Sequence, residues 1–82
     1  MNDFKDFKNW IETGNEIEFL YKGKNYSVTY FVNESNQEAI SFCEFYKEPV
    51  EFYTVEDFMN NAKIGDELLK DIWDKATDIS VF

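Results

Sequence analysis

The sequence contains no histidine and no arginine, and all eight of its basic residues are lysines. The missing histidine removes the usual general base near neutral pH and the commonest metal ligand. The missing arginine removes the planar group that holds a phosphate or carboxylate at two points. Most hydrolase mechanisms and arginine-finger catalysis are thereby excluded, and we expect a protein that is not an enzyme.

Cysteine is also scarce, since Cys43 is the only one. One cysteine cannot form an internal disulfide, and without histidine it cannot complete a zinc site. It lies beside Glu44, whose carboxylate disfavours a reactive thiolate, so we interpret it as a small hydrophobic residue. We therefore predict no cofactor and no metal.

Long apolar runs are absent as well. The first residues alternate charges where a signal peptide would be apolar, and no run approaches the roughly 18 apolar residues of a membrane span. These features predict a cytoplasmic protein. Seventeen acidic residues give a formal net charge of −9. Such a charge repels nucleic-acid phosphates and anionic lipid, so neither direct nucleic-acid binding nor membrane binding is expected.

Aromatic residues are abundant, at 20% of the chain. A chain of 82 residues buries only about 60 to 65% of the surface of its unfolded form, so its core must be dense, and buried rings supply that density. No linker, repeat or low-complexity run divides the sequence. We predict one domain over residues 1–82.

A helix is predicted near the N-terminus. Asn2 or Asp3 can cap it, and Gly14 supplies a left-handed stop. Its apolar residues recur on one stripe, as in an amphipathic helix: Phe4, Phe7, Trp10 and Ile11.

An antiparallel meander is predicted to follow. Residues 16–21 alternate in polarity, and Lys22-Gly23 is a typical two-residue hairpin turn. Pairing Tyr21 with Lys24 places the apolar residues of both strands on one face: Ile17, Phe19, Tyr26, Val28 and Tyr30.

A third strand is predicted from Glu38 to Tyr46. Either Ile40 and Phe42 face the core, or the alternate set of Ala39, Ser41, Cys43 and Phe45 does, and the larger apolar groups favour the first choice. Lys47-Glu48-Pro49 ends this strand. Residues 50–53 form a possible short fourth strand at the edge, where proline does little harm.

Two C-terminal helices are predicted to pack on one sheet face. Thr54 caps the first, which ends at Ile64-Gly65. Asp66 caps the second, whose apolar stripe is Leu68, Leu69, Ile72, Trp73 and Ala76. The predicted fold class is α+β. The tail from Thr77 to Phe82 is apolar enough to dock, but the pattern does not place it.

The face of the sheet opposite the core, which we call the outer face, is predicted to carry an interaction surface made of Leu20, Phe31, Cys43 and Phe45. Small polar residues lie among them: Ser27, Thr29 and Ser41. Four apolar residues on the exposed side of a single sheet favour a cover, supplied either by the C-terminal tail or by another chain.

Several segments resemble small uncharacterised acidic proteins of Gram-positive bacteria. They are residues 10–19, residues 21–24 with Tyr26-Ser27, residues 40–45 leading into Glu48-Pro49, and the segment from Leu69 to Trp73. The resemblance covers most of the chain and its residues are of a structural kind. It implies no activity and assigns no functional residue.

Two functions from different classes follow. The first is a non-enzymatic module that binds a protein partner of unknown identity, with a homodimer as one form. The second is an inhibitor that mimics nucleic acid, because carboxylates three or four residues apart on a helix can imitate a row of phosphates. Asp71, Asp74 and Asp78 would supply that row, although Lys70 and Lys75 interrupt it.

Overall fold

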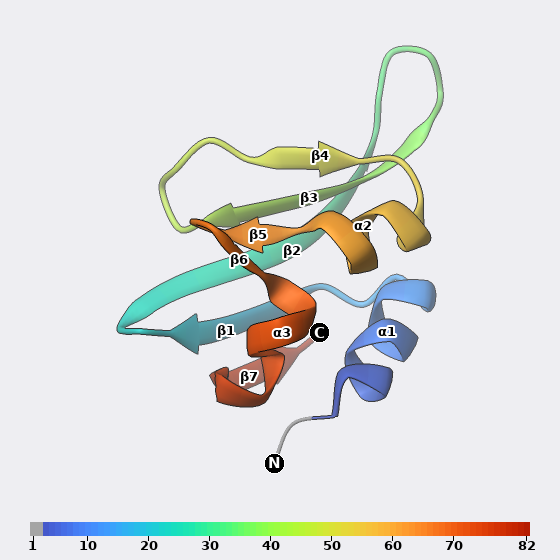
Figure 1. The fold of residues 1–82 in the computed structure, drawn as a ribbon. Coiled ribbons are helices and arrows are strands. Elements are labelled where there is room, and N and C mark those ends of the chain that lie inside the picture. Colours follow the sequence, from blue (N-terminus) through green and yellow to red (C-terminus); the bar gives the residue numbers. More distant parts are fainter. Residues whose placement is uncertain (1–2) are drawn as a thin grey trace.

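The computed structural model describes residues 3–82 and shows three helices and a five-stranded antiparallel sheet (Figure 1). The fold class is α+β. The elements in chain order are α1 (Phe4–Glu12), β1 (Ile17–Tyr21), β2 (Lys24–Val32), β3 (Glu38–Glu44), β4 (Val50–Phe52), α2 (Val55–Asn61), β5 (Lys63–Ile64), β6 (Glu67–Leu68), α3 (Leu69–Ile72), a 3₁₀ turn (Trp73–Lys75) and β7 (Thr77–Val81).

The strand order in the large sheet is β4-β3-β2-β1-β7. The β1–β2 hairpin has the predicted register, with Tyr21 opposite Lys24 and Ile17 opposite Val28. Lys22 and Gly23 both have positive φ, at 50° and 77°. That geometry belongs to the tight turn that matches the twist of two antiparallel strands, and it fixes the register.

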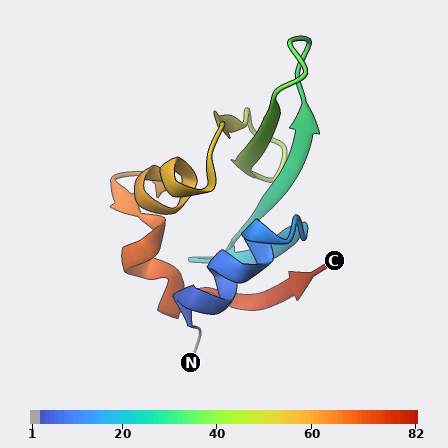
Figure 2. The ribbon, with the colours of Figure 1, turned by 90° about the vertical axis from the view of Figure 1, so that its right-hand side faces the viewer.

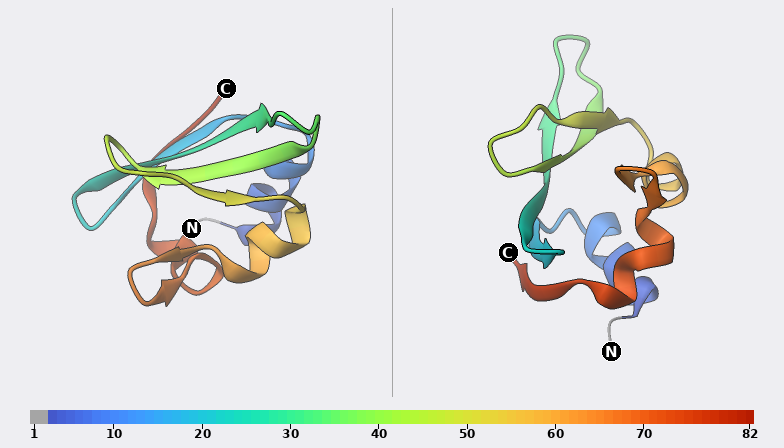
Figure 3. Two further views of the ribbon diagram at one scale, coloured as in Figure 1. Left: turned by 90° about the horizontal axis from the view of Figure 1, so that it is seen from above. Right: turned by 60° about the vertical axis from the view of Figure 1, so that its left-hand side comes forward.

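The helices all lie on one side of this sheet, and no element of residues 3–82 covers the other side (Figures 2 and 3). The core fills the space between the two layers. Phe7 of α1, Phe58 of α2 and Trp73 are fully buried against the sheet. Phe19 and Phe42 meet them from the strands, with ring centroids 5.1 Å from Trp73 and 5.9 Å from Phe58, respectively.

The third strand faces the core with Ile40 and Phe42, which are both buried. The favoured choice is therefore confirmed. Ala39, from the alternate set, is also buried, but it lies outside the hydrophobic core cluster. The possible fourth strand is confirmed as β4, which pairs with β3 through Phe52 and Ile40.

Two predicted helix starts agree with the structure. The Asp3 side chain accepts a hydrogen bond from the main-chain N–H of Lys5, and the Thr54 hydroxyl accepts one from Asp57. Each cap satisfies an otherwise unpaired helix donor, which contributes about 1 kcal/mol. The alternative cap at Asn2 lies outside the described residues. Gly14 has a φ of 74°, as a left-handed stop requires.

The second C-terminal helix was wrongly predicted. Gly65 and Asp66 form the turn of a small hairpin, in which Ile64 of β5 pairs with Glu67 of β6. Asp66 is therefore not a helix cap, and α3 contains only four residues. The predicted stripe does reach the core, since four of its five residues are buried: Leu69, Ile72, Trp73 and Ala76.

The tail is a strand, which the sequence pattern left unplaced. Residues 77–81 pair antiparallel with β1 as β7, with Ile17 opposite Val81 and a bulge between the paired positions. Asp78 has a φ of 50°, and Ile79 turns inward to pack on the core. The tail thus extends the sheet at its edge and does not cover the outer face.

Candidate functional site

The outer face of the sheet is the first candidate site. Side chains alternate between the two faces of a strand, so the cross-strand pairs define rows on this side. One row joins Ser27 to Cys43, the next Thr29 to Ser41, and the next Phe31 to Ala39. All described helices lie on the opposite side of the sheet (Figure 3). The outer face is therefore uncovered in the part of the chain that the structure describes.

The structure brings three of the four predicted residues together. Leu20 of β1 lies opposite Asn25 of β2. On the β3 side of Asn25, the main-chain N–H of Phe45 donates a hydrogen bond to the Asn25 carbonyl. Cys43 occupies the neighbouring row, where its Sγ lies 3.7 Å from the Ser27 Oγ. Leu20, Cys43 and Phe45 are thus half-buried at the same end of the outer face, with Asn25 and Ser27 of β2 between Leu20 and the other two.

Phe31 belongs to a different group. It lies six residues along β2 from Asn25, which is about 20 Å at 3.3 Å per residue. Its cross-strand neighbour is Ala39. Tyr53, which follows β4, continues this row by alternation and is 47% exposed. The outer face therefore has two apolar ends.

A polar band separates the two ends. Ser27, Thr29 and Ser41 are half-buried and present hydroxyl groups between the two apolar ends. The charged residues of the outer face lie toward its sides, with Glu18 opposite Ser27 on β1 and Glu51 opposite Ser41 on β4. The middle of the outer face is therefore uncharged in a chain with a net charge of −9.

Sequence reasoning missed two residues near this face. Tyr53 was predicted only as the end of a short strand, although alternation from the core-facing Phe52 would have assigned it to the outer face. Tyr46 is fully exposed and has a φ of 67° at the turn after β3. No local signal distinguishes it from the buried tyrosines.

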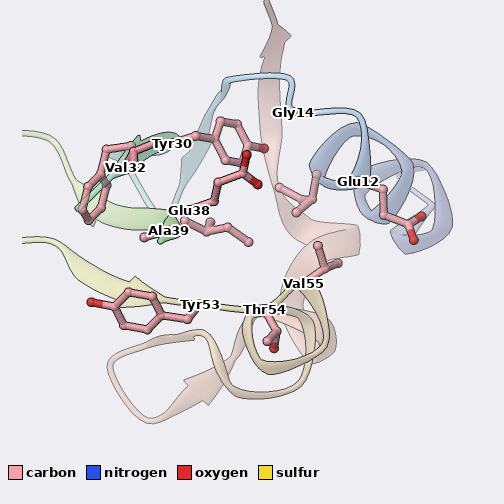
Figure 4. Close-up of a pocket in the computed structure, with 12 residues that line it drawn as sticks. Glu12, Gly14, Tyr30, Val32, Glu38, Ala39, Tyr53, Thr54 and Val55 are labelled. Carbon is pink, nitrogen blue, oxygen red and sulfur yellow. The ribbon is translucent and has the colours of Figure 1, made fainter. Parts of the chain in front are cut away.

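A cleft of about 380 Å³ is the second candidate site, and the sequence did not indicate it (Figure 4). It lies where β2 and β3 extend past the helices, between the end of α1 and the start of α2. Its apolar wall includes Ile11, Val32, Ile40 and Val55, and its charged residues are Glu12 and Glu38. The lining contains no lysine.

Tyr30 anchors one wall of this cleft. Its hydroxyl donates a 2.7 Å hydrogen bond to the carbonyl of Asn15, which ties β2 to the chain that leaves α1. Burial, together with the negative charge of Glu16, raises the pKa of Tyr30 to about 12. The phenol therefore stays neutral at physiological pH and acts as a hydrogen-bond donor.

The acidic row required for nucleic-acid mimicry was wrongly predicted. Asp71 lies on α3, Asp74 lies in the 3₁₀ turn, and Asp78 lies on β7 with its left-handed backbone. The three carboxylates therefore do not lie on one helix, as the predicted row requires.

Within residues 3–82, no group of three or more cysteine or acidic side chains is arranged to hold a metal ion. No helix in that range has the length and apolar character needed to cross a membrane.

Comparisons of the chain with protein-family models, curated proteins and solved structures gave no match.

Proposed function

We propose that this chain is a non-enzymatic interaction module of the cytoplasm that self-associates through the outer face of its sheet. The supporting observation is the pair of apolar ends around Leu20 and Phe31, on a face that no described element covers. Exposed apolar area of this kind is characteristic of protein–protein contact surfaces. A second copy of the chain is the partner that fits best.

The first argument for a second copy is the pattern of the face. A two-fold axis within the interface brings each residue against a symmetry-related surface, so the surface must complement itself. The outer face meets this condition, because it has two apolar ends with a band of hydroxyl groups between them. If the strands of the two copies run in the same direction, like ends meet. If the strands run in opposite directions, the Leu20 end meets the Phe31 end, and apolar surface still contacts apolar surface.

The second argument is charge. Two copies with a net charge of −9 each repel one another, and a basic partner would be drawn to acidic surface. The middle of the outer face is free of charged groups, so two copies can meet there with little local repulsion. Added salt screens the remaining repulsion over a Debye length of about 10 Å at 0.1 M. Self-association should therefore strengthen as salt is added.

The third argument is size. Five strands about 4.8 Å apart and roughly 20 Å long give a face of roughly 450 Å² in projection. Two such faces bury less than the approximately 1,600 Å² of a standard interface, and they match the size of weak, transient contacts. The dimer should therefore dissociate in the micromolar range or above.

The test is sedimentation velocity over a concentration series that reaches several hundred micromolar. A half-buried Phe31 still exposes roughly 50 Å², and removing it from both copies costs about 2.5 kcal/mol, or roughly 70-fold in dimer dissociation constant. We expect Phe31→Ser to weaken the dimer accordingly. The control is Val50→Ser, which removes a side chain that is 57% exposed and faces the same side of the sheet as Phe42, away from the outer face. A wild-type monomer at every concentration, or equal effects of the two variants, contradicts the proposal.

A further inference from the structure

The edge of β2 is open beside the cleft. β3 pairs with β2 as far as Val32, whereas β1 pairs with it only as far as Val28. Among residues 3–82, no strand pairs with β2 on the β1 side beyond Val28. The last four residues of β2 therefore have a strand on one side only.

The main-chain groups on this open edge can be identified. The two-residue turn makes Tyr21 and Lys24 a hydrogen-bonded pair, so every second residue of β2 directs its N–H and C=O toward β1. The Asn25 carbonyl accepts from Phe45 on the β3 side, which agrees with this alternation. Tyr30 and Val32 therefore present their main-chain groups to the open edge.

The cleft lies beside this edge, and its lining includes core-facing residues together with Phe31, Ala39 and Tyr53 from the adjoining end of the outer face. Tyr30 and Val32 line it from β2, and Val55 lines it from the start of α2 (Figure 4). A strand placed along the open edge would direct every second side chain toward the cleft. An open edge and an adjacent apolar cleft are the two elements of recognition by strand addition.

The charge of the cleft restricts the partner. Glu12 and Glu38 line it, Glu16 is close enough to act on Tyr30, and no lysine is in the lining. An apolar side chain therefore fits the wall of the cleft, and cationic side chains complement its carboxylates. A second copy of this acidic chain would be repelled there, so the complementary partner is a basic segment of another protein.

We propose that the open edge of β2 and its cleft bind an extended basic segment of another protein by strand addition, with an apolar residue in the cleft and a lysine or arginine two positions away on each side. Residues two apart in a strand face the same way, about 6.6 Å from one another. The apolar side chain enters between Val32 and Val55, and the flanking cations approach Glu12 and Glu38.

The test is a titration of the isotope-labelled full chain with the capped peptide Lys-Thr-Val-Thr-Lys, followed by amide chemical shifts. We expect saturable shifts centred on Tyr30, Val32 and the end of α1. A peptide with glutamate in place of both lysines should bind at least about 10-fold more weakly, since two attractive pairs become repulsive. A peptide methylated on the valine nitrogen, which loses a strand hydrogen bond, should also bind more weakly.

Protein variants give a matched test. Glu12→Gln combined with Glu38→Gln should weaken the lysine peptide about 3- to 20-fold, as the loss of two exposed ion pairs implies. Glu48→Gln combined with Asp74→Asn makes the same change in net charge away from the cleft, and it should weaken binding less than about 2-fold.

Four results would overturn the proposal. One is the absence of saturable shifts at about 5 mM peptide, well above the range of specific peptide binding. A second is equal binding of the glutamate peptide. A third is shifts centred on Leu20, Cys43 and Phe45, at the end of the outer face that does not line the cleft. The fourth is equal binding of the methylated peptide, which would mean that the cleft takes a cationic side chain without strand addition.

Discussion

Replacing Phe42 by alanine should cost a large part of the stability of the fold. The ring is buried and has its centroid 6.2 Å from that of Phe19, 6.1 Å from that of Tyr26 and 5.9 Å from that of Phe58. Removing a buried phenylalanine ring costs about 3–5 kcal/mol, because the transfer free energy is lost and a cavity remains. A domain of this size has a total stability of roughly 4–12 kcal/mol.

The same substitution on the other face provides the control. Phe31→Ala removes a half-buried ring from the outer face and should cost about 0.5–1.5 kcal/mol. Urea unfolding followed by far-UV circular dichroism gives both values, at low micromolar protein so that association does not contribute. Equal costs for the two variants, or a smaller cost for Phe42→Ala, would refute the assignment of the core to the Phe42 side of the sheet.

Four further outcomes follow from the structure. Because burial raises the pKa of Tyr30 to about 12, the stability that its neutral hydroxyl contributes is complete below pH 10.0, its ordinary pKa, and declines as pH rises from 10 to 12. Tyr30→Phe should therefore flatten the decline of the urea midpoint over this range. Gly23→Ala should destabilise by about 1–2 kcal/mol in the same assay, because Gly23 has a φ of 77°; a neutral result would contradict the turn geometry. A hydrogen bond from Lys22 lowers the pKa of Glu67, so the stability that the charged carboxylate contributes is present above pH 4.5 and declines as pH falls below that value. Glu67→Gln should remove this decline of stability on the acid side. Ile79→Ser should lower the thermal midpoint by several degrees if β7 packs on the core, whereas an unchanged midpoint would place the tail elsewhere.

The elements best predicted from the sequence are those whose signals are local. The Lys22-Gly23 turn fixes a register, and the residues around it alternate consistently with that register. The caps at Asp3 and Thr54 depend on neighbouring residues only. For the third strand, alternation left two choices, and the greater apolar size of Ile40 and Phe42 selected the correct one.

The segment after α2 could not be predicted in the same way. Its apolar residues fit a helical stripe, and burial of Leu69, Ile72 and Trp73 does not require one continuous helix. The two-residue turn at Gly65-Asp66 divides the segment, and the bulged pairing of β7 with β1 joins residues about sixty positions apart. Contacts at that separation depend on the assembled sheet and leave no periodic signal.

The candidate sites show the same division. Alternation placed Leu20, Phe31, Cys43 and Phe45 on one face, but it did not reveal that Phe31 lies roughly 13 to 20 Å from the other three along β2. The cleft depends on where β1 stops pairing with β2 and on how α1 and α2 are positioned. Those are properties of the tertiary structure, and the residues of the lining come from distant segments.

Isotope-filtered nuclear Overhauser spectroscopy tests the central claim most directly. A mixture of labelled and unlabelled chains at several hundred micromolar reports only contacts between copies. Self-association through the outer face predicts such contacts at the side chains of Leu20, Phe31, Cys43 and Phe45, and their loss in Phe31→Ser. Contacts between copies that involve only the helical side, or none at all at that concentration, would contradict the account.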